Sequence, residues 1–177
     1  MGLYIYRLEG AALLDGAMYE GIESDRAVSL QAAATVVLSS LATGVGSTSW
    51  SGWHPLGIAT VTGVALLMWV AWAALMFQIG TRVLPEPATH TDLGELLRTT
   101  GFAAAPGLFQ VLAVLPRMAV PVFVVTSVWM FVAMIIAIKH VLDFQSTWRA
   151  LAVCAIGAAL CLSLAVVLGL MLTRPAS

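Results

Sequence analysis

Long stretches without charge alternate with short charged segments along this chain. The intervals free of Asp, Glu, Lys and Arg are residues 27–81, 99–116, 118–138 and 150–173. A transmembrane helix needs about 20 apolar residues to cross a hydrocarbon core of about 30 Å. The first interval is long enough for two helices, and turn-forming residues around 46–55 divide it. The pattern predicts an all-α integral membrane bundle with five spans, at about 27–46, 56–81, 99–116, 119–138 and 150–173.

The third predicted span contains a helix-breaking sequence. Ala105, Pro106 and Gly107 fall near its middle, where proline removes a backbone donor and clashes with the preceding turn. We therefore expect this span to be kinked or broken. Just before it, Asp92 and Glu95 have the spacing of a capping box and predict a helix start.

The segment before the spans, residues 1–26, is predicted to be a cytoplasmic segment with a short interfacial helix, followed by the transmembrane domain, 27–177. Asp15 is placed to cap a short helix over residues 16–23, and Ser24 or Asp25 to cap the first span. Leu14, Met18 and Tyr19 give the short helix an apolar face. Two interpretations stay open for it: an interfacial helix at the lipid headgroups, or a docking site for a partner.

Basic residues predict the orientation in the membrane, because short loops rich in Lys and Arg remain cytoplasmic. A cytoplasmic N-terminus puts six of the eight basic residues inside, and the C-terminus then lies outside. These six are Arg7, Arg26, Arg82, Arg98, Lys139 and Arg149, with Arg117 and Arg174 outside.

Composition excludes two broad classes of protein. Hydrophobic residues make up 60% of the 177 and charged residues 10%, whereas soluble domains have about a quarter charged. A net charge of −1 provides no basic surface for nucleic acid, which we do not expect as a partner. The expected surroundings are the lipid bilayer and other integral membrane proteins.

Chemical motifs are scarce. No Asp, Glu, Lys or Arg lies inside a predicted span, which argues against a proton-coupled transporter. The three histidines have no second ligand at helical spacing, and no nucleophile or phosphate-loop motif occurs. We expect no metal, no cofactor and no enzymatic activity.

Small residues recur at four-residue spacing, which lets helices approach closely in lipid. The pairs are Ser40 with Gly44, Ala155 with Ala159, and Gly157 with Cys161. They serve either the bundle itself or contact with a neighbouring subunit.

Several short runs together resemble a known family. They are Leu13-Leu14-Asp15, Tyr19-Glu20, Gly80-Thr81-Arg82, Leu96-Leu97-Arg98-Thr99-Thr100-Gly101-Phe102-Ala103 with Ala105-Pro106, Trp129, Ala137-Ile138-Lys139 and Leu142-Asp143. Over residues 8–165 the chain is similar to the bacterial branch of the Yip family, five-span proteins named for eukaryotic members that interact with Ypt/Rab GTPases. The resemblance implies a cytoplasmic N-terminus and marks Arg98, Gly101, Pro106 and Asp143 as structural motif residues. Since the long N-terminal region that engages GTPases is missing before residue 27, GTPase binding is not carried over.

These observations lead to one main hypothesis and two alternatives. The main one is a non-enzymatic protein of a bacterial cytoplasmic membrane that organises or stabilises lipids or neighbouring proteins through helix contacts. Arg98→Ala is then expected to impair folding more than binding. The alternatives are an accessory subunit of a respiratory or photosynthetic complex, and a small transporter or channel subunit, the latter suggested by Pro106.

Overall fold

The protein is all-α in every part that the structure describes. The computed structural model describes residues 2–84 and 91–172, without the side chains of residues 23, 24, 26 and 164–172. No strand occurs in these two ranges. In chain order the helices are α1 (Gly2–Ala12), α2 (Gly16–Ser24), the 3₁₀ turn η1 (Arg26–Val28), α3 (Ser29–Gly46), α4 (Thr48–Ser51), α5 (Pro55–Gln78), the π-helix η2 (Ile79–Val83), α6 (Leu93–Ala103), the 3₁₀-helix η3 (Ala105–Val114), α7 (Ala119–Val141) and α8 (Thr147–Leu172).

Among the residues whose side chains the structure describes, three helical stretches are long and apolar enough to cross a membrane. They are Ser29–Ser51, Pro55–Val83 and Ala119–Val141, and Thr147–Ser163 is a shorter apolar helix. The prediction of an all-α membrane protein is therefore confirmed. The predicted spans at 27–46, 56–81, 119–138 and 150–173 fall on α3, on α5 with η2, on α7 and on α8.

The predicted third span is the place where the chain departs most from a regular helix. α6 ends at Ala103, and the chain continues as the ten-residue 3₁₀-helix η3. The expected break is therefore present, and its cause is visible: Pro106 has no N–H, and the Gly107 amide bonds to the carbonyl of Ala104, 2.9 Å away. At about 1.5 Å per α residue and 2.0 Å per 3₁₀ residue, α6 and η3 together rise about 36 Å.

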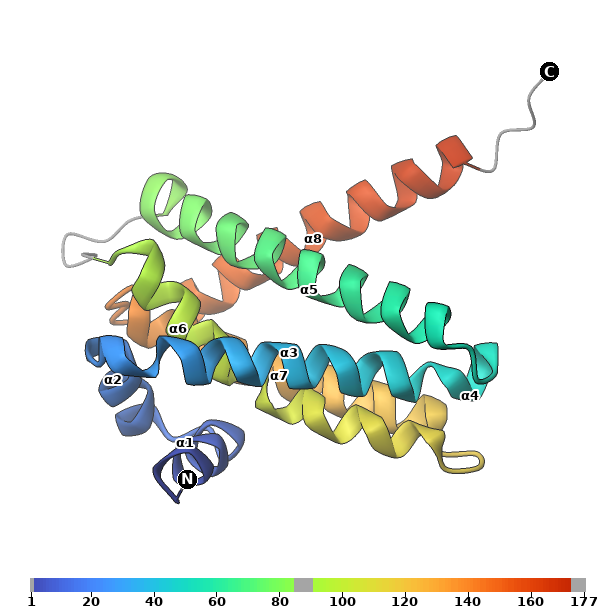
Figure 1. Cartoon of the computed structure of the whole chain (residues 1–177). Coiled ribbons are helices and arrows are strands. Elements are labelled where there is room, and N and C mark those ends of the chain that lie inside the picture. The colour runs from blue at the N-terminus through green and yellow to red at the C-terminus, as the bar shows by residue number, and fades with distance from the viewer. Residues whose placement is uncertain (1, 85–90, 173–177) are drawn as a thin grey trace.

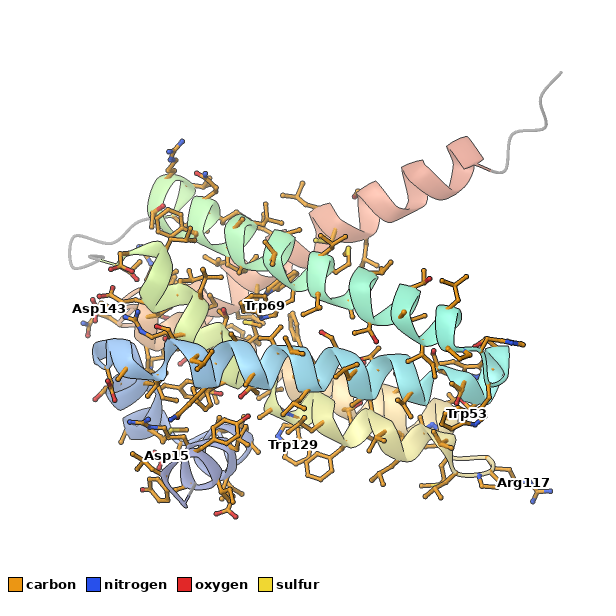
Figure 2. The ribbon with its side chains drawn as sticks, in the orientation of Figure 1. Asp15, Trp53, Trp69, Arg117, Trp129 and Asp143 are labelled. Carbon is orange, nitrogen blue, oxygen red and sulfur yellow. The ribbon has the colours of Figure 1, made fainter. Side chains whose placement is uncertain are left out.

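The helices form an elongated bundle with distinct ends, shown in Figure 1. α3, α5, α7 and η3 run along its length, and η3 packs mainly against α3 and α7. α8 packs against α7, α5 and η2 and then leaves the bundle, so its last turns lie far from the other helices. Figure 2 labels Arg117 and Trp53 at one end and Asp143 and Asp15 at the other. We call these the Arg117 end and the Asp143 end.

Most of the core lies towards the Asp143 end. Its largest fully buried side chains come from α2, α5, α6, α7 and the turn after α7, and include Tyr19, Met76, Phe102, Ile138 and Leu142. By contrast, large apolar side chains along α5 and in the first half of α7 are exposed. In a membrane protein this is expected, because lipid covers side chains that would otherwise be forced inwards.

Capping explains where the short helices begin. Asp15 precedes α2 as predicted, and its side chain accepts the amide of Ala17 at 3.1 Å. Asp25 accepts the amide of Ala27 at 2.9 Å and so caps the 3₁₀ turn η1, whereas α3 itself starts without a side-chain cap. The chain thus enters α3 through one tight turn.

Candidate functional site

The motif run of residues 96–106, which the resemblance marked, begins on α6, and a capping box fixes the start of this helix. The Asp92 side chain accepts the Glu95 amide at 2.7 Å, and the Glu95 carboxylate accepts the Asp92 amide at 2.9 Å. This is the predicted capping box. One turn later Arg98 is buried, with 6% of its surface exposed. A cation is thus held inside the protein near the start of α6.

Gly101 lies where α6 crosses α3. A Cβ atom at Gly101 would come within 3.0 Å of the Ala32 Cβ and 3.2 Å of the Ala32 carbonyl oxygen. Real Cβ atoms rarely approach other atoms so closely, so the crossing requires a residue without a side chain. Gly101 therefore has a structural role in this packing.

Pro106 occupies the first turn of η3 and is buried. Next to it, a Cβ at Gly107 would lie 3.0 Å from the sulfur of Met130 and 3.2 Å from the Ser39 Cβ. Together, Gly101 and Gly107 hold the α6–η3 segment tightly against its neighbours. Arg98, Gly101 and Pro106 hence belong to one structural unit.

Asp143 belongs to a different place. It follows α7 with a positive φ of 52°, a conformation that Asp tolerates better than most residues, and its amide donates to the His140 carbonyl at 2.9 Å. Its side chain lines a cavity of about 320 Å³ with Glu20, Lys139 and His140. There the His140 ring lies 3.3 Å from the carboxylate of Glu20. This contact connects α2 to the end of α7.

Two of the three residues predicted as a docking surface are inside the protein. Tyr19 is fully buried and donates its hydroxyl to the Ala11 carbonyl at 3.2 Å, and burial raises the pKa of this phenol above its usual range. Met18 is buried against Gly10. Leu14 is half-buried in the turn between α1 and α2, with a φ of 65°. Met18 and Tyr19 therefore pack into the protein's own core, and Leu14 is the most exposed of the three residues.

The sequence reasoning missed a row of polar residues along α3. The row is Gln31, Thr35, Ser39 and Thr43, each four residues after the last. This spacing places all four side chains on one helix face. The polar face could therefore have been predicted from the sequence. We call this set the polar row.

Groups from other helices form hydrogen bonds with the polar row. Thr35 shares a hydrogen bond with the hydroxyl of Tyr4 at 3.1 Å, and Ser39 donates to the Ala104 carbonyl at 2.8 Å. Thr43 donates to the side-chain carbonyl of Gln110 on η3. The row therefore connects α3 to α1, to the end of α6 and to η3, which is a packing function.

Helix α1 was also missed, although it packs on the bundle. Tyr4, Leu8 and Ala11 face the core at helical spacing. Arg7 forms an ion pair with Asp25 at 2.9 Å and donates to Gln31 at 3.1 Å. At the far end of α1 the carbonyl of Ala12 accepts the indole N–H of Trp129 at 2.8 Å. The N-terminal segment therefore packs against helices of the predicted transmembrane domain.

Within residues 2–84 and 91–172, His, Cys, Asp and Glu form no group of three or more that could hold a metal ion. Cys154 is buried in α8.

Taken together, these features define the class as a multi-pass, all-α membrane protein. The Yip1 domain family model matches residues 18–168, so the chain belongs to the Yip family. The match starts within α2 and leaves α1 outside it. No curated protein and no solved structure matches the chain.

Proposed function

We propose that this Yip family member is a non-enzymatic organiser of neighbouring membrane proteins and lipids in a bacterial cytoplasmic membrane. It acts through the exposed faces of its helices. Its hydrogen-bonded polar groups are committed to holding its own helices together, as the polar row illustrates. The exposed apolar surface of the helices is therefore what remains for contact with neighbouring proteins and lipids.

The observation that carries the proposal is the exposure of α5. In the most apolar part of Pro55–Val83 only 11% of residues are buried, compared with 44% in Ser29–Ser51. Leu67 is 71% exposed, and Val64 and Met68 are exposed beside it. α8 contacts α5 at Trp72 and Met76 and then leaves the bundle (Figure 1), and Leu67 remains exposed. α5 therefore offers a long surface on which another transmembrane helix or lipid chains can pack.

Photo-crosslinking in native membranes tests this proposal. A photo-reactive amino acid at Leu67 is expected to give discrete adducts with other membrane proteins. The control is the same amino acid at Trp148, which is 78% exposed but lies at the start of α8, away from the α5 face. Adducts at Leu67 that are no more frequent or distinct than those at Trp148 would contradict a role for this face. Adducts at fixed stoichiometry with one large complex would instead favour an accessory subunit.

The proposal includes five spans, a cytoplasmic N-terminus and an external C-terminus. The alternation of chain direction supports it: Arg117 lies at the opposite end of the bundle from Asp143 (Figure 2). The rise of about 36 Å for α6 with η3 is sufficient for a third crossing. The excess of basic residues on one side supports the orientation.

Thiol labelling tests this topology. In a chain whose two native cysteines are replaced by alanine, single cysteines at Arg82 and Lys139 are expected to react only after the inner face becomes accessible. A cysteine at Arg117 is expected to react from outside. Labelling of Arg82 and Lys139 from opposite sides would refute the five-span layout.

A further inference from the structure

A groove of about 360 Å³ lies between the beginnings of α3 and α6 and the middle of α5. Ala32, Ala33 and Gly94 leave space in it because their side chains are small or absent, and Val36, Val70 and Leu97 give it apolar walls. It is separate from the polar cavity around Asp143.

Besides Ser29, two large side chains with polar groups line this mostly apolar groove. One is Arg98, whose guanidinium lies so close to Gly94 that a Cβ there would be 3.3 Å from Nη1. The other is Trp69, whose indole N–H is buried and has no hydrogen-bond partner in the described protein. Figure 2 shows Trp69 in the middle of the molecule, on α5. A buried donor without a partner is costly, so a ligand that accepts from it gains affinity.

We propose that this groove is a binding site for an anionic phospholipid. The lipid phosphate binds the Arg98 guanidinium, an ester carbonyl accepts the Trp69 N–H, and an acyl chain lies along Val36, Val70 and Leu97. A guanidinium has five N–H donors, so it can bind a phosphate while keeping contacts within the protein.

Charge and position select this occupant. The groove has one buried cation and mostly apolar walls, which matches a molecule with one anionic group and long hydrocarbon chains. Arg98 lies five residues into α6, about 8 Å along its axis. That depth suits a long side chain reaching the phosphate level from inside the bilayer. The inference uses Trp69 and Val70 of α5 but does not depend on the exposed face around Leu67 or on any protein partner.

The test is lipid binding by the full-length protein in a non-ionic detergent, followed by native mass spectrometry. The probes are phosphatidylglycerol and phosphatidylcholine with identical acyl chains. Wild type is expected to bind phosphatidylglycerol about tenfold more tightly, equivalent to about 1.4 kcal/mol. Equal affinity for the two lipids would overturn the proposal.

Ala33→Phe is the decisive variant, because Ala33 is exposed on the groove wall and its enlargement fills the groove without entering the core. It is expected to lower phosphatidylglycerol affinity about tenfold at unchanged helix content. The matched control, Ala152→Phe, adds the same side chain to an exposed position on α8 and should bind as wild type.

Arg98→Gln serves as the second variant and should lose the preference for phosphatidylglycerol if it folds. Wild-type binding by Ala33→Phe would overturn the proposal. A protein dimer that Ala33→Phe disrupts, with no lipid preference, would assign the groove to a second copy of the chain and also overturn it.

Discussion

Replacing Gly101 with alanine tests how closely α6 and α3 must approach. The added methyl would lie 3.0 Å from the Ala32 Cβ and 3.2 Å from the Ala32 carbonyl oxygen. Ordinary contacts between such atoms are about 3.5–4.0 Å, so the two helices must separate by several tenths of an ångström. The backbone of α3 cannot rotate away as a flexible side chain would.

The expected cost follows from this geometry. Overpacking by one methyl in a close-packed interior destabilises by about 1–3 kcal/mol. Alanine also has a higher helix propensity than glycine, worth about 1 kcal/mol in the opposite direction. Gly63→Ala isolates this second effect, because a Cβ at Gly63 on α5 meets nothing within 4 Å. We expect Gly101→Ala to be less stable than wild type and Gly63→Ala to be as stable or more so.

Reversible unfolding of the purified protein in mixed micelles, followed by far-UV circular dichroism, measures both changes. The double variant Ala32→Gly/Gly101→Ala removes one of the two close contacts and should recover part of the loss, with a coupling of about 0.5–3 kcal/mol. If Gly101→Ala unfolds at the same denaturant concentration as Gly63→Ala, the close crossing inferred from the structure is refuted.

Three further predictions concern the contacts of the N-terminal helices and the polar row. Tyr19→Phe should cost about 0.5–1.5 kcal/mol by removing the hydrogen bond to Ala11. Because burial raises the pKa of Tyr19 in the folded protein, only the unfolded chain ionises this residue as the pH rises above about 10, and wild-type stability should fall there. In thermal unfolding, Tyr19→Phe should lack this part of the fall. Arg7→Ala should speed amide exchange in α1 about tenfold or more by removing its bonds to Asp25 and Gln31, whereas exchange unchanged in mass spectrometry would show that these bonds do not hold α1. A double-mutant cycle of Thr43→Val and Gln110→Leu should give a coupling of about 0.6 kcal/mol, typical of such bonds in membranes, and additive losses would exclude it.

The sequence was most informative where one physical effect dominates. Long uncharged runs indicated α3, α5, α7 and α8, because a single segment of about 20 apolar residues satisfies its own backbone polar groups in lipid by forming a helix. The helix starts after Asp15 and Asp92 were predictable as well, because capping depends on residues within one turn.

The sequence was least informative where distant contacts decide the outcome. Pro106 indicated a break, but the ten-residue extent of η3 depends on packing against Ser39 and Met130 from other helices. The apolar face of α2 has the same pattern whether it meets a partner or the protein's own core, and the structure places Tyr19 in the core. α1 was missed because its short apolar pattern includes Arg7, whose partner Asp25 comes from a later turn.

The extended form of η3 has a mechanical consequence. Ten residues in a 3₁₀-helix are about 5 Å longer than the same residues in an α-helix. A change of helix type in η3 alone would therefore alter the length of this segment by as much as different cellular bilayers differ in thickness.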